Sequence, residues 1–272
     1  MPVNTMADKV EKHMAFLEHL EELRWTLVWI AVATALGTGV AWFFSSDMLA
    51  FLSTDLNKIL ETALGVGQTF DLHVFEVGEA FTTRLKVALL MGLLIALPFN
   101  IFKVWQFVSP GLFKREKRMA GPLVLLSIVL FYCGVLFAYL IMVKLTVAFL
   151  FRLKPPEVVA TIRIGSYVSF VTKFCVTFGL VFQLPLVQAV LSWTGLVSTE
   201  TLRRGWRFAL VGVLVLSALL TPPDIISQVL LTVPVLGLYW VGILLAKAFE
   251  RRRQPEDESP TAKEEITSEP DD

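Results

Sequence analysis

WTLVWIAVATALGTGVAWFFSS, residues 25–46, is the stretch that decides the fold class of this chain. It contains no charged side chain, and its length matches the roughly 20 helical residues that cross a hydrocarbon core about 30 Å thick. The whole composition agrees, because the chain is 55% hydrophobic and only 18% charged, with a mean hydropathy of +0.67. Soluble domains carry more charge than this. The stretch therefore predicts a membrane-spanning helix.

Five further stretches of low charge follow, separated by charged residues or by proline and glycine. The predicted spans are residues 25–46, 87–108, 119–151, 165–193, 208–221 and 225–246. We therefore predict an all-α, polytopic membrane protein with six transmembrane helices. An even number of spans places both termini on the same side of the membrane.

The distribution of charge sets the orientation of these spans. The connector at residues 110–118 contains four lysines and arginines, and the connector at residues 194–207 contains three arginines. The connector at residues 47–79 instead holds six acids and a single lysine. Because lysine and arginine favour the cytoplasmic side, we predict that both termini are cytoplasmic.

The two ends of the chain differ in character from the membrane domain, residues 25–246. In residues 1–24, apolar side chains recur at helical spacing with glutamates on the opposite face, which predicts a cytoplasmic amphipathic helix. Residues 247–272 begin with a basic anchor and continue as an acidic tail, which we expect to be disordered. No removable signal peptide is expected at the N-terminus.

A sharp turn is predicted between the fifth and sixth spans, at Thr221, Pro222, Pro223 and Asp224. Two consecutive prolines lack backbone donors and disfavour helix before them, and an aspartate suits the N-cap of the helix that follows. The fifth and sixth spans are therefore expected to form a tight hairpin. Because the fifth span is short, we expect either a thinned bilayer or a shielded helix there.

Polar residues inside the spans need partners, because lipid offers none. Gln183 lies deep in the fourth span, and Pro185 two residues later frees a backbone carbonyl nearby. From chemistry alone, a hydrogen bond within the chain and a docking site for another subunit's helix explain Gln183 equally well. Glu22 and Glu116 lie beside cytoplasmic cations, and ordinary surface pairing is the simplest interpretation of both.

Motifs for catalysis or cofactor binding are absent from the sequence. There is no phosphate-cradling glycine loop, no histidine-rich metal spacing, no nucleophile elbow and no redox cysteine pair. We therefore expect neither an enzyme nor a bound cofactor or metal, and no nucleic-acid partner.

Four strings together resemble the TatC family across residues 14–247. They are HLEELR at residues 19–24, WQFVSPGLFKRE at 105–116, FGLVFQLP at 178–185 and TPPDIISQ at 221–228. The resemblance implies a subunit of a translocase in the bacterial inner membrane that exports folded proteins. It agrees with the prediction that both termini of this chain are cytoplasmic. It also implies the proton-motive force as energy source, TatA-like and TatB-like single-span partners, and self-association.

The same resemblance assigns roles to individual residues. It implies that Glu22 and Glu116 bind the arginine pair of a twin-arginine signal peptide, with Phe107 beside them and Arg24 in the same motif. Carboxylates suit this role because they meet a guanidinium in a bidentate fork. A second set is implied or predicted to contact partner helices: Gln183, Pro185, Thr221 and Gln228. Gln183 stands where many relatives carry glutamate.

Two other classes of membrane protein agree less well with the sequence. A secondary transporter of a small solute is the leading alternative, but it would place ionisable groups or helix breaks near the midplane of paired repeats. A membrane-embedded enzyme would need His, Asp, Glu or Cys clustered at one depth. The two acids singled out above, Glu22 and Glu116, lie instead at the predicted cytoplasmic rim.

Overall fold

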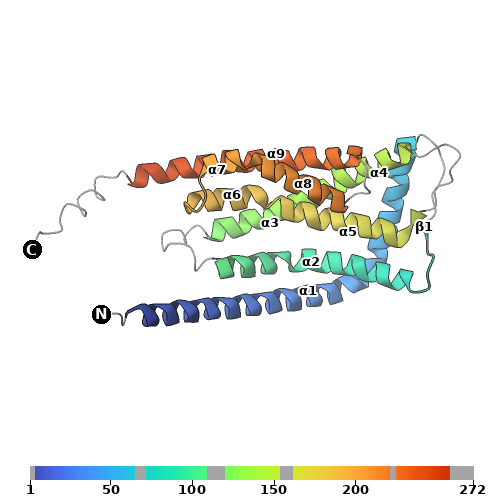
Figure 1. Cartoon of the computed structure of the whole chain (residues 1–272). Helices are drawn as coiled ribbons and strands as arrows, with labels where there is room; N and C mark the ends of the chain where they lie inside the picture. Colours follow the sequence, from blue (N-terminus) through green and yellow to red (C-terminus); the bar gives the residue numbers. More distant parts are fainter. Residues whose placement is uncertain (1–3, 65–71, 109–119, 154–161, 221–224, 258–272) are drawn as a thin grey trace, which may run out of the picture. The chain divides into compact units, whose positions relative to one another are not determined.

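The computed structural model describes residues 4–64, 72–108, 120–153, 162–220 and 225–257 (Figure 1). Most of these residues are helical, and the rest form two short strands, turns and short connections. The predicted all-α, multi-span class is therefore confirmed. Within the described residues, five helical stretches are long and apolar enough to cross a membrane. They are His19–Thr62, Glu79–Val108, Gly121–Arg152, Ile164–Trp193 and Gln228–Ala248. The predicted fifth span corresponds to the shorter apolar helix Trp206–Leu220, so the count of six stays a prediction.

The described chain divides into two compact units, and three of the boundaries between them fall inside helices. The first unit comprises Met1–Thr62, Val66–Val129 and Val158–Thr172. The second comprises Ala63–Gly65, Leu130–Glu157 and Lys173–Asp272.

Helix α1, Asn4–Leu64, dominates the first unit and is longer than the sequence predicted. It runs without interruption through residue 24, so no helix end separates the predicted amphipathic segment from the first span. It also continues well past residue 46, and Figure 1 shows its lighter blue C-terminal part turning away from the axis of the first part. The extension is explained by a buried apolar face at helical spacing, formed by Leu52, Leu56, Ile59 and Leu60.

Helix α2, Glu79–Val108, packs closely against α1. A Cβ atom on Gly37 would lie 2.5 Å from the carbonyl oxygen of Gly92, so the two backbones touch where these glycines meet. The buried side chain of Asn100 donates from Nδ2 to Oγ1 of Thr34 at 3.1 Å. Small residues and an interhelical hydrogen bond are the usual means by which membrane helices associate.

Two additional features complete the first unit. Strands β1, Leu72–His73, and β2, Ile162–Arg163, pair in parallel with Leu72 opposite Ile162. Near the other end of α2, Trp105 donates from Nε1 to Oγ of Ser127 at 2.8 Å and so joins α2 to α3, Ala120–Phe137.

In the second unit the third span continues from α3 through a π-helix, Ala138–Val143, into α4, Lys144–Arg152. The fourth span breaks between α5, Ile164–Val181, and α6, Leu184–Trp193. Gly195, with φ of 77°, follows the end of α6, where the left-handed conformation favours glycine.

The remaining helices of this unit are α7, Thr199–Arg204, α8, Trp206–Leu220, and α9, Ile225–Asp257. Ser198 caps α7 by accepting from the Thr201 N–H, and Tyr239 of α9 donates to the Leu202 carbonyl at 2.6 Å. Helix α9 extends past residue 246, so the predicted end of the membrane domain is not marked by a helix end.

Candidate functional site

Two of the predicted signal-peptide residues, Glu22 and Phe107, lie where the N-terminal part of α1 meets the C-terminal end of α2. The His19 ring stacks on the Phe107 ring, with centroids 4.4 Å apart and planes 10° from parallel. One helical turn along α1, the carboxylate of Glu22 lies with Oε2 3.8 Å from Nδ1 of His19. The structure thus brings Glu22 and Phe107 to one place, and His19 joins them.

Exposure leaves this carboxylate available to a ligand. The Glu22 side chain is 44% exposed, and Arg24, two positions along the helix, is also exposed. Residues two apart on a helix do not face each other, so the simple surface pair between Glu22 and Arg24 is not favoured by the helix geometry. Glu116, the second predicted carboxylate, lies outside the described residues.

The place of His19 beside Phe107 was not predicted from the sequence. His19 begins the HLEELR string, of which only Glu22 and Arg24 were expected at the site. The spacing of three residues between His19 and Glu22 was the available signal, because side chains three apart lie on the same helix face.

The predicted partner-contact residues occupy two places in the second unit. Gln183 is the N-cap residue of α6, so it lies at the break in the fourth span, and Pro185 is buried in the first turn after it. The Gln228 side chain donates from Nε2 to the Leu214 carbonyl at 2.9 Å and thereby joins α9 to α8. Thr221, Pro222, Pro223 and Asp224 lie outside the described residues.

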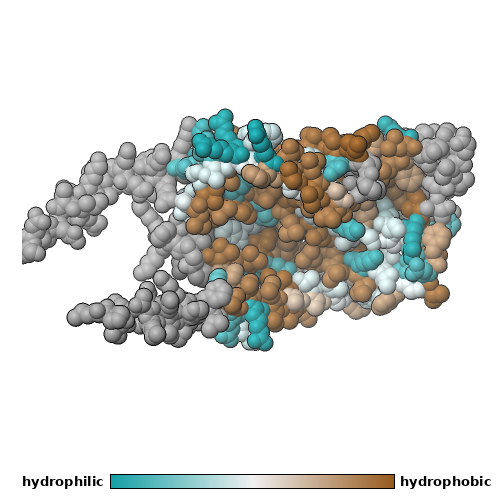
Figure 2. Space-filling model, viewed as in Figure 1, coloured by the Kyte–Doolittle hydropathy of each residue, from teal (hydrophilic) through white to brown (hydrophobic). Residues whose placement is uncertain are grey.

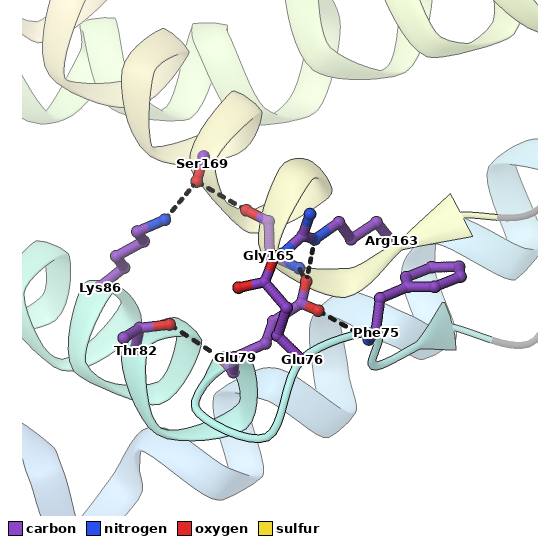
Figure 3. A network of polar contacts seen from close by, with 8 residues as sticks. All are labelled: Phe75, Glu76, Glu79, Thr82, Lys86, Arg163, Gly165 and Ser169. Carbon is purple, nitrogen blue, oxygen red and sulfur yellow. Dashed lines mark hydrogen bonds and ion pairs between the residues drawn. The ribbon is translucent and has the colours of Figure 1, made fainter.

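A polar network at the N-terminal ends of α2 and α5 was not predicted (Figure 3). The Glu79 side chain is 3% exposed. Its Oε1 accepts from Nε of Arg163 at 2.7 Å and from the Gly165 N–H at 3.1 Å, while its Oε2 accepts from the Phe75 N–H at 2.8 Å. Nη2 of Arg163 also reaches Glu76 at 2.7 Å.

This network follows from charge placement at the starts of two spans. Glu79 is the first residue of α2, and Arg163 immediately precedes α5. Two parallel spans that begin with opposite charges can place these charges together. The charges at the two helix starts are therefore the sequence feature from which this ion pair could have been predicted. Hydrogen bonds to Glu79 and Glu76 raise the pKa of the Arg163 guanidinium further above its usual range. The network holds the loop before α2 against the start of α5.

Comparisons with known proteins place these features in a family. The model of the family described as Sec-independent protein translocase protein (TatC) matches residues 18–234. A TatC protein from Desulforapulum autotrophicum is 35% identical over 249 residues, which cover 91% of this chain and 90% of that protein. The TatC protein of Escherichia coli K12 is 33% identical over 240 residues, with coverages of 88% and 91%.

The comparison of structures agrees with the comparison of sequences. A crystal structure described as the twin arginine translocase receptor TatC matches this chain with a TM-score of 0.75 and 33% identity. The match covers 85% of this chain and 99% of that one. With a family model that spans most of its length and relatives of nearly equal size, the chain belongs to the TatC family of Sec-independent protein translocase proteins.

Proposed function

We propose that the chain is a receptor for twin-arginine signal peptides and the core subunit of a translocase that exports folded proteins with the proton-motive force. The similar crystal structure is described as a translocase receptor, which supports this proposal. Within the chain, the observation that carries it is the exposed Glu22 carboxylate beside the stacked rings of His19 and Phe107.

The side chains of Glu22, His19 and Phe107 together suit the binding of an arginine-containing peptide. An exposed carboxylate can accept two parallel N–H bonds from a guanidinium, which an ammonium group cannot supply. The face of a neighbouring aromatic ring adds an attractive surface for the same planar cation. In this proposal Glu22 and Glu116 bind the arginine pair, Phe107 contacts the adjoining apolar part of the peptide, and Arg24 belongs to the surrounding motif.

The chain is a multi-pass membrane protein, and we place it in the bacterial cytoplasmic membrane with both termini inside. The exposed Arg203, Arg204, Arg207 and Lys247 of the second unit support this orientation, because cations favour the cytoplasmic face. Residues 1–24 then form the cytoplasmic part of α1, residues 25–246 the membrane domain and residues 247–272 the cytoplasmic end. Its role is transport by binding and conformational change, without a chemical reaction of its own.

TatA-like and TatB-like single-span proteins are the proposed partners, and Gln183, Pro185, Thr221 and Gln228 are the proposed contacts. Two features of the second unit support this surface. The break at Gln183 interrupts a helix inside the apolar region, and α8 is too short to span a bilayer of ordinary thickness. Both features favour a protein neighbour over lipid.

Glu22→Gln provides the test, and Glu21→Gln is its matched control. Both glutamates are exposed on α1, but only Glu22 lies within 4 Å of His19 among the described pairs. A charge-assisted hydrogen bond contributes about 1.5–3 kcal/mol, so we expect roughly ten-fold weaker crosslinking of a twin-arginine precursor to the Glu22 variant. Crosslinking to the Glu21 variant should be unchanged.

The signal peptide supplies the second arm of this experiment. A precursor with two lysines in place of its two arginines should crosslink weakly to the native chain and should lose little more on Glu22→Gln. If Glu21→Gln and Glu22→Gln weaken crosslinking equally, or if the two precursors bind equally well, the arginine site is not at Glu22.

A further inference from the structure

An apolar groove runs along the first unit between α1 and α2, and it holds about 450 Å³. We call it the α1–α2 groove. Its α1 wall includes Trp29, Ala33, Leu36 and Val40, which follow one another at helical spacing. Phe99 belongs to the wall from α2. The Leu36 side chain is 69% exposed and Trp29 is 50% exposed, so the groove is open along its length.

The groove has a rigid base and a defined polarity. The close contact of Gly37 with Gly92 fixes the two helices against each other. Toward Trp29 the groove nears residue 25, the predicted start of the first span. Figure 2, viewed as Figure 1, shows polar, teal residues toward the N-terminal end of α1 and apolar, brown residues farther along it. Tryptophan favours this depth, where an apolar body meets polar headgroups.

A cation lies at this end of the groove. The Lys103 amine is 5.9 Å from the centroid of the Trp29 ring and 5.7 Å from that of Phe99, so it stands over two rings that line the groove. It donates to Oε1 of Gln106 at 3.0 Å, and within the described ranges no carboxylate forms an ion pair with it. Lys103 is five residues before Val108, the end of α2, or about 7.5 Å along the axis, a depth from which lysine reaches the headgroups.

We propose that the α1–α2 groove is a binding site for an anionic phospholipid, with one acyl chain along the groove and the phosphate on Lys103. The apolar walls take the acyl chain, and the amine retains two donors for phosphate oxygens. A lipid of the cytoplasmic leaflet has its headgroup at the level of Lys103 when the N-terminus is inside.

The dimensions of the groove favour a lipid over a peptide. From Trp29 to Val40 the α1 wall is about 16 Å long. A helix about 10 Å across could enter the groove only with part of its circumference, so most of its surface would stay outside. An extended peptide is narrower, but its backbone N–H and C=O groups would lack partners against apolar walls. An acyl chain has no such groups.

The charge at the mouth favours the same occupant. A single lysine near the membrane surface contributes about 1 kcal/mol to the attraction of anionic lipid, which corresponds to about five-fold in binding. The same positive charge would repel the basic end of a targeting peptide.

Native mass spectrometry of the full chain in neutral detergent tests the proposal. Phosphatidylglycerol and phosphatidylcholine with identical acyl chains are offered separately, and the lipid retained per protein is counted. We expect about five-fold stronger retention of phosphatidylglycerol by the native chain. Lys103→Gln should remove this preference, whereas Lys86→Gln should keep it, because Lys86 lies on α2 away from the groove and donates to Ser169 at 2.9 Å.

A second variant tests the acyl-chain part independently of charge. Ala33→Phe places a ring in the groove and should lower retention of both lipids alike, with an unchanged thermal unfolding midpoint as the control for folding. Equal retention of the two lipids by the native chain, or an undiminished preference in Lys103→Gln, would overturn the proposal. So would an Ala33→Phe variant that binds lipid normally but loses binding of an apolar signal peptide, since the groove would then be a peptide site.

Discussion

The crossing of α1 and α2 at Gly37 can be tested with one methyl group. In Gly37→Ala the new Cβ would lie 2.5 Å from the Gly92 carbonyl oxygen, 3.2 Å from its carbonyl carbon and 3.3 Å from its Cα. All three atoms belong to the backbone of α2, so no side-chain rotation can relieve the contact. Gly39→Ala is the matched control, because a Cβ there meets no atom within 4 Å.

Two opposing effects set the magnitude. Alanine in place of glycine inside a helix stabilises the folded state by about 0.5–1 kcal/mol. Overpacking in a close contact costs about 1–3 kcal/mol, and a backbone contact belongs at the upper end of that range. We therefore expect Gly37→Ala to lower the free energy of unfolding by about 2 kcal/mol and Gly39→Ala to raise it by up to about 1 kcal/mol.

Thermal unfolding of the purified chain in detergent measures the difference. At about 2–4 °C per kcal/mol for a domain of this size, the Gly37 variant should melt roughly 4–8 °C below the native chain, and the Gly39 variant slightly above it. If both variants shift the midpoint in the same direction by similar amounts, the helices do not touch at Gly37 and the base of the α1–α2 groove is not fixed by this crossing.

Three other predictions concern separate parts of the chain. Glu79→Gln should reduce the stable accumulation of the protein and its export activity, because it removes the charge that Arg163 faces. Glu76→Gln should have little effect, because the Glu76 side chain is 69% exposed. Immunoblotting and an export assay measure both, and a larger loss in Glu76→Gln than in Glu79→Gln would contradict the prediction. Trp105→Phe should lower the free energy of unfolding by about 0.6 kcal/mol through the lost bond to the Ser127 hydroxyl, and a loss of the same size in a chain that already carries Ser127→Ala would contradict this origin. Removal of residues 254–272 should leave insertion and export unchanged in a protease-protection assay, and loss of export from a stably inserted protein would identify that segment as a partner site.

The sequence was sufficient to predict the class of fold, an all-α protein with several membrane-spanning helices. Long uncharged stretches such as residues 25–46 carry this information locally, because each must supply enough apolar length to cross the bilayer. The extension of α1 to Leu64 was missed for the opposite reason. Leu52, Leu56 and Leu60 form an apolar helix face in a segment that is too polar to be a span, and its partners are determined only by the fold.

The candidate sites were predictable to different degrees. Glu22 and Phe107 were identified from a family resemblance, and their proximity through the His19 ring depends on the contact of two helices distant in sequence. The ties from Glu79 to Arg163 and from Gln228 to Leu214 were not foreseen. Each is a tertiary contact between groups that look like ordinary surface or span-end residues when read singly.

The pairing of β1 with β2 has a consequence for the order in which the protein is built. Leu72 and Ile162 are partners in the register, and 90 residues separate them along the chain. At about 5–20 residues per second, the ribosome needs roughly 5–18 s to synthesise this interval. Before Arg163 has been synthesised, the Glu79 carboxylate lacks this ion-pair partner. The hydrogen bonds around Glu79 can form completely only after the start of α5 has been synthesised, which makes closure of this network a late step in biogenesis.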